Sequence, residues 1–463
     1  MKFTDHINLS SLLGAELSLF WVIPFVGILL SIAILPLIKP ILWHHNYGKI
    51  SAFWALSFIL PFIYSKGISV ALHKIMHVMF IEYLPFIILL LSLYTISGGI
   101  RLKGRLSGTP KSNVLIILIG TILASWMGTT GAAMLLIRPL LRANKWRQYT
   151  VHTIVFFIFL VANIGGALTP LGDPPLFLGF LHGVDFFWTT QIMLFPMCLV
   201  SITLLFIYYL IDSFYYRKEQ IPNSTTIIDN EPIGIEGTGN ILLLFCVISV
   251  VLMSGFWQPE VNELNIMGIH VKIQNLLRDI ILIILILLSW LMTNREIRMK
   301  NSFTWIPIQE VAKLFAGIFI TIIPVIAILQ AGAHGALHPI INMITDTEGN
   351  PVNSMYFWLT GILSGFLDNA PTYLVFFNIA GSSAPEGTII AEYLMKQMPI
   401  TLMAISAGAV FLGALTYIGN APNFMVQSIA EENNVKMPSF FGYMLWSILI
   451  LIPIFLIVSI LLF

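Results

Sequence analysis

Long apolar segments alternate with short polar connections along most of the chain. A helix needs about 20 apolar residues to cross a bilayer. The segments lack the roughly ten-residue alternation of a transmembrane barrel, and helices satisfy their own backbone hydrogen bonds in lipid. The pattern therefore predicts membrane-spanning helical segments near residues 20–42, 50–64, 80–98, 113–140, 150–181, 189–212, 239–257, 275–293, 311–331, 355–380, 400–425 and 440–462.

Two of these apolar segments are interrupted by nearly the same phrase. The first copy is Gly166-Ala-Leu-Thr-Pro-Leu-Gly-Asp-Pro-Pro-Leu-Phe177, and the second is Gly413-Ala-Leu-Thr-Tyr-Ile-Gly-Asn-Ala-Pro-Asn-Phe424. Seven positions are identical, and two more are Leu/Ile and Asp/Asn exchanges. Paired interruptions at related positions of two halves are typical of the binding site of a secondary transporter.

Lys and Arg residues concentrate in a few of the connections, and short cytoplasmic loops collect such residues. The first two basic connections flank the single segment 113–140, so both of its ends are expected on the cytoplasmic side. We therefore predict a re-entrant hairpin there, with its turn among Ser125, Gly128, Thr129, Thr130 and Gly131. The basic connections carry Arg101, Lys103, Arg105 and Lys111; Arg142, Lys145 and Arg147; Arg217 and Lys218; and Arg295, Arg298 and Lys300.

The same topology makes segment 355–380 a second hairpin, which enters from the opposite face and turns at Leu367-Asp-Asn-Ala-Pro-Thr372. An ordinary pair of short helices, or a single span, is the alternative for each hairpin. Each half then has about five crossings, one of them interrupted, and one re-entrant hairpin. The prediction is an inverted repeat of residues 1–212 and 239–463, joined by a polar cytoplasmic linker at 213–238 that contains Pro222, Asn223, Ser224, Asp229, Glu231 and Gly237.

Composition gives the protein class. Of 463 residues, 57% are hydrophobic and 10% are charged, with a mean hydropathy of +0.90. These values predict an all-α polytopic membrane protein rather than a soluble domain. The net charge is only +1, without a large basic block, so the expected partner is the lipid bilayer and not nucleic acid. Cys198 and Cys246 lie inside apolar runs, where free thiols behave as small hydrophobes.

Asp173 is the first candidate for chemistry. It precedes Pro174, an arrangement that suits a helix N-cap followed by proline in the first turn. Asn420 occupies the same place in the second copy, so an uncharged residue can begin a half-helix there. A charged side chain at the membrane centre costs about 2.5–3.5 kcal/mol on insertion scales. A bound cation or proton would explain why the first copy carries an acid.

Asp368 is the second candidate. It lies with Asn369 at the turn of the second predicted hairpin, and Pro371 follows, so a capping role is open there as well. The first hairpin has Thr129 and Thr130 at roughly equivalent places. In each pair of equivalent motifs, only one of the two repeats carries an acid, whereas small polar residues occur in both repeats.

These side chains could meet where the two halves join. Carboxylate, hydroxyl and amide oxygens, with unwound carbonyl groups, are the ligands that a monovalent cation accepts. We predict a Na⁺ site formed by Asp173, Asp368, Thr169 and Asn420, with the exchange of a proton for the cation near neutral pH. The full candidate set adds Asn163, Asn369, Thr416, Thr129 and Thr130, and the backbone of the breaks would be shaped by Gly166, Gly172, Pro174, Pro371, Gly413, Gly419 and Pro422. Close helix packing is the alternative role of the glycines.

Three runs resemble the ion transporter superfamily, most closely its NhaD-type sodium/proton antiporters and citrate-transporter-like proteins. They are Asn163-Ile-Gly-Gly-Ala-Leu-Thr-Pro-Leu-Gly-Asp-Pro-Pro175, Leu367-Asp-Asn-Ala-Pro-Thr372 and Thr416-Tyr-Ile-Gly-Asn-Ala-Pro-Asn423. The resemblance implies a scaffold that forms a homodimer and a transport unit that moves in an elevator-like way. The dicarboxylate branch typically carries Ser-Asn-Thr at both hairpin tips, whereas this chain has Gly128-Thr-Thr130 and Asp368-Asn-Ala370.

The leading hypothesis is a sodium/proton antiporter of the cytoplasmic membrane, with no cofactor besides the transported Na⁺ and H⁺. The main alternative is a cation-coupled symporter of citrate or another organic anion, and a permease for a neutral oxyanion such as arsenite also stays open. The sequence contains no nucleotide-binding phosphate loop, nucleophile elbow or Cys/His cluster, which argues against a primary pump or an enzyme. Two aspartates could form the acid/base pair of an intramembrane enzyme, but the duplicated architecture argues for transport.

Overall fold

The computed structural model describes residues 14–463 except 105–106, 220–231, 233, 258, 260–262, 347 and 386. The described chain is nearly all helical, which confirms the predicted all-α polytopic class. Nine of the described helices are long and apolar enough to cross a membrane, or up to eleven if each of two bent pairs is one span. The linker residues Pro222, Asn223, Ser224, Asp229 and Glu231, and the basic residue Arg105, lie outside the described residues.

The first half of the chain ends with the longest helix, α9. Its helices are α1 (Ile23–Ile38), α2 (Pro40–Lys66), α3 (Ile68–Val78), α4 (Leu84–Ser97), α5 (Pro110–Met127), α6 (Thr129–Ala143), α7 (Val151–Leu160), α8 (Pro174–Leu181) and α9 (Phe186–Tyr216). Shorter elements are the helical turns η1 (Gly14–Glu16), η2 (Leu19–Val22), η3 (Met79–Tyr83) and η4 (Ile164–Leu168), and the strand β1 (Arg101–Lys103).

The second half begins with the strand β2 (Gly234–Glu236). Its helices are α10 (Gly239–Phe256), α11 (Ile273–Met292), α12 (Arg295–Lys300), α13 (Ile306–Thr321), α14 (Ile323–Gln330), α15 (His338–Met343), α16 (Asn353–Leu367), α17 (Asn369–Gly381), α18 (Ile390–Gln397), α19 (Pro399–Phe411), α20 (Ala421–Glu432) and α21 (Phe440–Leu462). Shorter elements are η6 (Gly332–His334), η7 (Leu412–Leu415) and the paired strands β3 (Glu263–Ile266) and β4 (Ile269–Lys272).

Both segments predicted as hairpins fold back on themselves. Helices α5 and α6 pack together, and Asn113 at the start of α5 donates a 2.9 Å hydrogen bond to Asn144, just after α6. The two ends of this segment therefore meet. Helices α16 and α17 pack in the same way, with the rings of Tyr356 and Phe376 at 6.3 Å.

Each hairpin turns within a single residue of positive φ. Gly128 has φ +81°, which glycine adopts readily because it lacks a Cβ. The equivalent residue of the second hairpin is Asp368 with φ +90°, a conformation that is uncommon for a residue with a side chain. Strain of this kind is found at binding sites more often than elsewhere.

The four basic connections lie at one end of the molecule. Strands β1 and β2 pair as an antiparallel ribbon, in which Arg101 bonds Glu236 at 2.9 Å and lowers the pKa of that carboxyl. Arg142 donates to the Leu102 carbonyl oxygen (2.7 Å), and Arg298 donates to that of Thr95 (2.8 Å). The backbone amides of Gln148 and Tyr149 donate to Glu219, which follows α9 (both 2.9 Å). These contacts join segments that the charge pattern placed on the same side.

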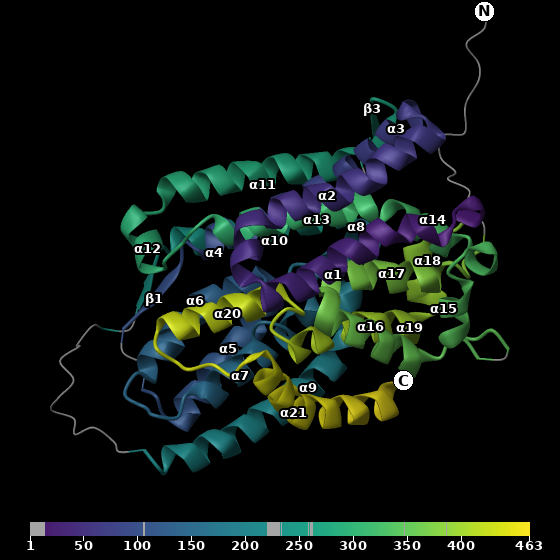
Figure 1. Cartoon of the computed structure of the whole chain (residues 1–463). Coiled ribbons are helices and arrows are strands. Elements are labelled where there is room, and N and C mark those ends of the chain that lie inside the picture. The colour runs from purple at the N-terminus through teal and green to yellow at the C-terminus, as the bar shows by residue number, and fades with distance from the viewer. Residues whose placement is uncertain are drawn as a thin grey trace, which may run out of the picture.

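The two broken helices run in opposite directions. In Figure 1, the chain passes from α7 at the left to α8 at the right, whereas it passes from α19 at the right to α20 at the left. The hairpin α5/α6 likewise lies toward the end that carries β1 and α12, and α16/α17 lies toward the end that carries α15 and α18. The two broken helices therefore run in opposite directions, and the division of the chain into the inverted repeats 1–212 and 239–463 stays a prediction.

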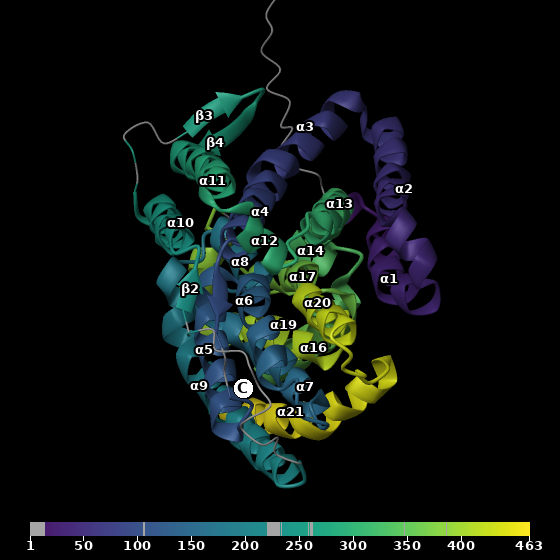
Figure 2. The ribbon, with the colours of Figure 1, turned by 90° about the vertical axis from the view of Figure 1, so that its left-hand side faces the viewer.

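The broken helices occupy the middle of the molecule. In the most apolar stretch of Val151–Leu168, 89% of the residues are buried. In that of Pro40–Lys66, only 22% are buried. Figure 2 shows α19 and α16 near the centre, with α1 and α2 at the rim on one side and α10 and α11 on the other. The unwound backbone is therefore enclosed by protein rather than exposed to lipid, as a membrane environment requires.

Several predicted boundaries were wrong. Segment 20–42 breaks at Lys39, because the residue before a proline is pushed out of the helical region. Helix α2 then starts ten residues earlier than the predicted 50–64, since His45 and Asn46 bond to carbonyl oxygens one turn back instead of forming a loop. Segment 80–98 starts at Ile68. Segment 400–425 extends to Glu432, and segment 311–331 bends by 41° between α13 and α14.

We predict that Gly172→Ala destabilises the protein. A Cβ at this position would lie 2.1 Å from the carbonyl oxygen of Gly166, so the break between α7 and α8 would have to open. Overpacking of this kind costs about 1–3 kcal/mol, which a lower unfolding temperature in detergent would report. Gly239→Ala is the matched control, because no described atom lies within 4 Å of the added methyl group. Equal unfolding temperatures for the two variants would contradict the close approach.

Candidate functional site

Asp173 lies at the centre of the molecule, at the N-terminus of α8, with 1% of its surface exposed. It occupies the N-cap position, but within the described residues its side chain makes no capping hydrogen bond. The backbone N–H of Thr129 donates to the carbonyl oxygen of Gly172 (2.9 Å), which holds the first hairpin tip beside the acid. Asp173 is therefore directed away from its own helix.

The Asp173 carboxylate accepts hydrogen bonds from three side chains. Thr129 at the first hairpin tip donates to Oδ1 (3.2 Å), and Asn420 at the second break donates to the same oxygen (2.9 Å). Asn369 at the second hairpin tip donates to Oδ2 (2.5 Å). Both hairpins and both broken helices thus meet at one carboxylate.

A second layer of amides joins the two breaks. Asn163, before η4, donates to the side chain of Asn423 (2.7 Å), and Asn423 donates to the carbonyl oxygens of Gly413 and Thr416 (both 2.9 Å). Asn420 also bonds the carbonyl oxygen of Ala162 (3.1 Å). These bonds satisfy carbonyl groups that the unwound segments leave without helical partners.

The two threonines of the repeated phrase make equivalent contacts. The hydroxyl of Thr169 donates to the carbonyl oxygen of Ser125 in α5, and that of Thr416 donates to the carbonyl oxygen of Gly365 in α16. Each hydroxyl also accepts an N–H two residues later, from Leu171 or Ile418 (both 3.2 Å). In this structure Thr169 and Thr416 fasten each broken helix to its hairpin, one layer away from Asp173.

The glycines and prolines shape the breaks. A Cβ on Gly419 would lie 2.5 Å from the carbonyl oxygen of Gly413, which repeats the close approach of Gly172 to Gly166. The prolines lie in the first turns of α8, α17 and α20, where a missing N–H costs little. These are Pro174, Pro371 and Pro422.

Asp368 has a different environment from Asp173. It is half-buried, and its carboxylate accepts the backbone N–H of Ala370 (3.2 Å) at the start of α17. The capping role left open by the sequence is therefore present at Asp368. Its neighbour Asn369 makes the contact with Asp173, as Thr129 does in the first hairpin, whereas Thr130 is half-buried one position further along.

The charge of this site is not balanced by a basic residue. None of the ion pairs in the described part of the chain includes Asp173. The Oδ1 atom of Asn369 is also buried and has no hydrogen-bond partner among the described residues. A buried carboxylate that has only neutral donors, next to an unused amide oxygen, is an environment that a cation or a proton would stabilise.

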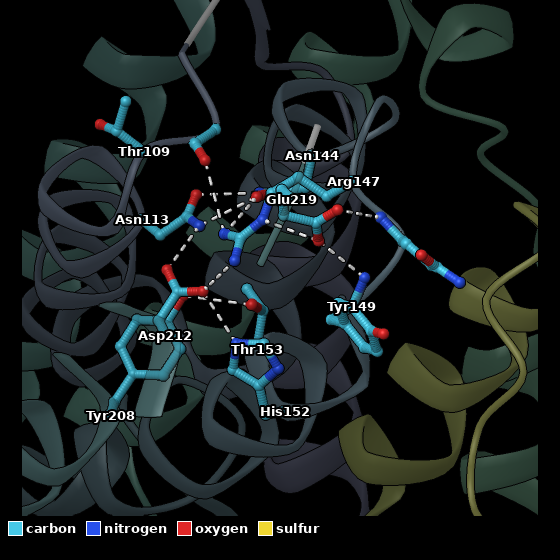
Figure 3. Close-up of polar contacts among 12 residues, drawn as sticks. Thr109, Asn113, Asn144, Arg147, Tyr149, His152, Thr153, Tyr208, Asp212 and Glu219 are labelled. Carbon is cyan, nitrogen blue, oxygen red and sulfur yellow. Dashed lines mark hydrogen bonds and ion pairs between the residues drawn. The ribbon is translucent and has the colours of Figure 1, made fainter. Parts of the chain in front are cut away.

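A separate polar cluster surrounds Asp212 at the base of the first hairpin (Figure 3). Its carboxylate, fully buried, bonds Arg147 (2.6 Å), His152 (2.8 Å), and Asn113 and Tyr208 (both 3.1 Å). These contacts join α9 to α5, to α7 and to the connection between α6 and α7. These contacts hold the base of the hairpin against α9.

Sequence reasoning missed this cluster. The charge pattern assigns Arg147 to a basic connection and gives His152 no role, yet only 6% and 2% of their surfaces are exposed. Asp212 was placed at the last position of a predicted crossing, without a role. Four residues separate Arg147 from His152, and Asp212 lies far along the chain, so no sequence motif links the three. Only the packing of α9 on α7 brings them together.

We predict that Arg147→Met lowers the unfolding temperature markedly, because it leaves a buried carboxylate without its cation, which costs about 3–5 kcal/mol. The double variant Arg147→Met/Asp212→Asn is expected to unfold at a higher temperature than Arg147→Met alone. Lys145→Met, on an exposed residue of the same connection, serves as the control. A wild-type unfolding temperature for Arg147→Met would contradict the role of this ion pair.

Comparison with known proteins identifies the family of the chain. A family model matches residues 14–463, which is nearly the whole chain. No curated protein matched the sequence. The resemblance to citrate-transporter-like proteins, noted from the three motifs, is thereby confirmed at the level of the family. The chain belongs to the family described as "Putative citrate transport".

Proposed function

We propose that this protein is a secondary transporter that exchanges Na⁺ for H⁺ at Asp173. The observation that carries the proposal is the buried Asp173 carboxylate, which accepts three hydrogen bonds from neutral side chains and has no ion pair within the described residues. A carboxylate in such a place is stable only when a proton or a cation offsets its charge. Either occupant gives a neutral site, and exchange between them is antiport.

The neighbouring oxygens suit a small hard cation. The carboxylate of Asp173 would supply the charge, and the side-chain oxygens of Asn369, Asn420 and Thr129 would complete the coordination. Protonation of Asp173 would remove the charge that holds the cation, so each occupant would favour the release of the other. Asp368 would lie beside this site and add negative potential when its carboxyl group is ionised.

The repeated architecture supports access from both sides. Each hairpin tip would separate the site from one aqueous phase, and movement of one inverted half against the other would expose it alternately. We further propose that the protein is a homodimer of the cytoplasmic membrane, with the basic connections inside. Residues 1–212 and 239–463 would then be the two inverted repeats, with a cytoplasmic linker between them.

Cation-coupled uptake of citrate is the second candidate, and the family description favours it. The helices α6, α8, α17 and α20 all begin at the site, and helix N-termini attract anions. An organic anion would nevertheless meet the Asp173 carboxylate, which no basic side chain in the described part of the chain pairs. The geometry therefore supports a cation more directly than an anion.

We predict that Asp173→Asn abolishes sodium-driven proton movement, because an amide can neither bind a proton in exchange nor offset a cation. The measurement is the response of an internal pH dye to added Na⁺ in proteoliposomes, compared with Li⁺ and K⁺. Asp185→Asn, on an exposed acid at the other end of the α8–α9 connection, is the control and keeps its response. Normal exchange by Asp173→Asn would rule out the proposal.

Labelled citrate distinguishes the two candidates in the same vesicles. For an antiporter, a Na⁺ gradient moves protons without citrate and drives no citrate uptake. If citrate uptake depends on Na⁺ or H⁺, and if no protons move when citrate is absent, the result contradicts antiport and supports symport.

A further inference from the structure

A groove of about 390 Å³ lies where α9 and α21 pack against each other, close to the C-terminal end of α9. Residues four apart on a helix share one face, so Leu210 with Phe214 and Ile211 with Tyr215 form two neighbouring rows. The described lining contains no charged side chain, and its members are Leu210, Ile211, Phe214 and Tyr215 of α9 and Trp446 of α21. Such a surface favours a hydrocarbon chain over water.

Two basic residues, Arg217 and Lys218, follow α9 directly, and both are exposed. The Nζ atom of Lys218 lies 4.0 Å from the ring centroid of Phe214 and 5.9 Å from that of Tyr215, so its charge lies beside the groove. None of the ion pairs in the described part of the chain includes either basic residue. Two cations therefore adjoin an apolar groove.

The next residue is an acid, Glu219, but its carboxylate is occupied elsewhere. It accepts the backbone N–H groups of Gln148 and Tyr149 (both 2.9 Å) and lies 3.7 Å from the guanidinium of Arg147. Only 4% of its side-chain surface is exposed. The exposed charge at this end of α9 is therefore positive.

The aromatic residues around the groove are those of a membrane–water interface. Trp and Tyr are enriched at that level of membrane proteins. Tyr215 and Trp446 line the groove, and the ring centroids of Trp146 and Tyr216 lie 6.0 Å apart beside it at the end of α9. Lys and Arg residues next to such an interface attract anionic lipid head groups. An apolar groove beside two unpaired cations at this level is complementary to an anionic lipid.

Tyr215 connects the groove to the base of the first hairpin. Its ring lines the groove and also stacks on the rings of His152 and Tyr149, with centroids at 5.0 and 5.2 Å. His152 bonds Asp212, whose contacts hold the hairpin base against α9. A molecule that packs on Tyr215 therefore supports the same contacts.

We propose that the groove between α9 and α21 binds an acyl chain of an anionic phospholipid, whose phosphate group contacts Lys218 and Arg217. The inference goes beyond the exchange proposed at Asp173 and does not depend on it. The bound lipid offsets the two cations and packs on Tyr215, and it thereby stabilises the end of α9 and the hairpin base. A zwitterionic lipid can fill the same groove, but it has no net charge to offset the cations.

Trp446 supplies the probe, because bromine atoms on an acyl chain quench the fluorescence of a tryptophan that they contact. The protein is reconstituted in phosphatidylcholine vesicles with a rising fraction of brominated phosphatidylglycerol or, separately, of brominated phosphatidylcholine. The quenching that is lost in Trp446→Phe reports the groove. We expect half-maximal quenching at a lower fraction of phosphatidylglycerol than of phosphatidylcholine, by about fivefold for each basic residue.

The double variant Arg217→Gln/Lys218→Gln is expected to lose this preference and to keep its quenching by brominated phosphatidylcholine. Lys49→Gln is the matched control and keeps the preference, since this exposed lysine belongs to α2, on the side of the molecule away from α9 (Figure 2). Added inorganic phosphate leaves the preference unchanged, because a free anion does not fill an apolar groove. Equal quenching of the wild type by the two lipids, an unchanged preference in the double variant, or loss of the preference in phosphate would each overturn the inference.

The unfolding temperature in mixed detergent–lipid micelles gives a second readout, and neither measurement requires transport. Phosphatidylglycerol is expected to raise the unfolding temperature of the wild type above its value in phosphatidylcholine, and to leave that of the double variant unchanged. An equal rise in both proteins would overturn the link to the hairpin base. If the lipid preference is found without sodium-driven proton movement, antiport fails while the lipid site stands, and the reverse result removes the lipid site alone.

Discussion

Backbone groups that leave a helix inside a membrane must find partners within the protein, and this requirement organises the whole structure. The breaks at residues 161–173 and 412–420 free carbonyl and amide groups that lipid cannot satisfy. Thr169 and Thr416 bond each break to a hairpin, and Asn163 and Asn423 bond the breaks to each other. The surrounding helices then enclose these polar segments. The candidate site is the place where the enclosed polar groups meet.

Asp173 and Asp368 show that an acid directly before a short helix can make either of two kinds of contact. Both precede a helix, and both were given the same role from the sequence. The carboxylate of Asp368 caps its own helix, whereas that of Asp173 turns to the other half of the chain for its donors. An acid at the start of a short helix can thus bond its own backbone or face the candidate site. The direction of its side chain decides between them.

Hydropathy, loop charge and the repeated phrase were sufficient to predict the order of the helices, the two segments that fold back and the place of Asp173 at the break before a short helix. These features depend on local composition and on side-by-side comparison of two similar stretches. The start of α2 was not predicted, because the polar side chains there have low hydropathy and suggest a loop. In the structure they bond to carbonyl oxygens of their own helix. The Asp212 cluster and the pairing of β1 with β2 depend on contacts between distant segments, for which single residues such as Arg147 give no pattern.

Two side-chain amides join the two breaks, and each of them occurs in only one half of the chain. Asn163 corresponds by position to Val410, and Asn423 corresponds to Leu176, so neither half contains the pair by itself. Two identical copies of one half, related by a twofold axis, would carry every ionisable group an even number of times. Because the halves differ within a single chain, an odd number of carboxylates can face the axis, as Asp173 does opposite Asn420. This chain therefore places one carboxylate opposite an amide, whereas a symmetric pair of subunits would bring two carboxylates together.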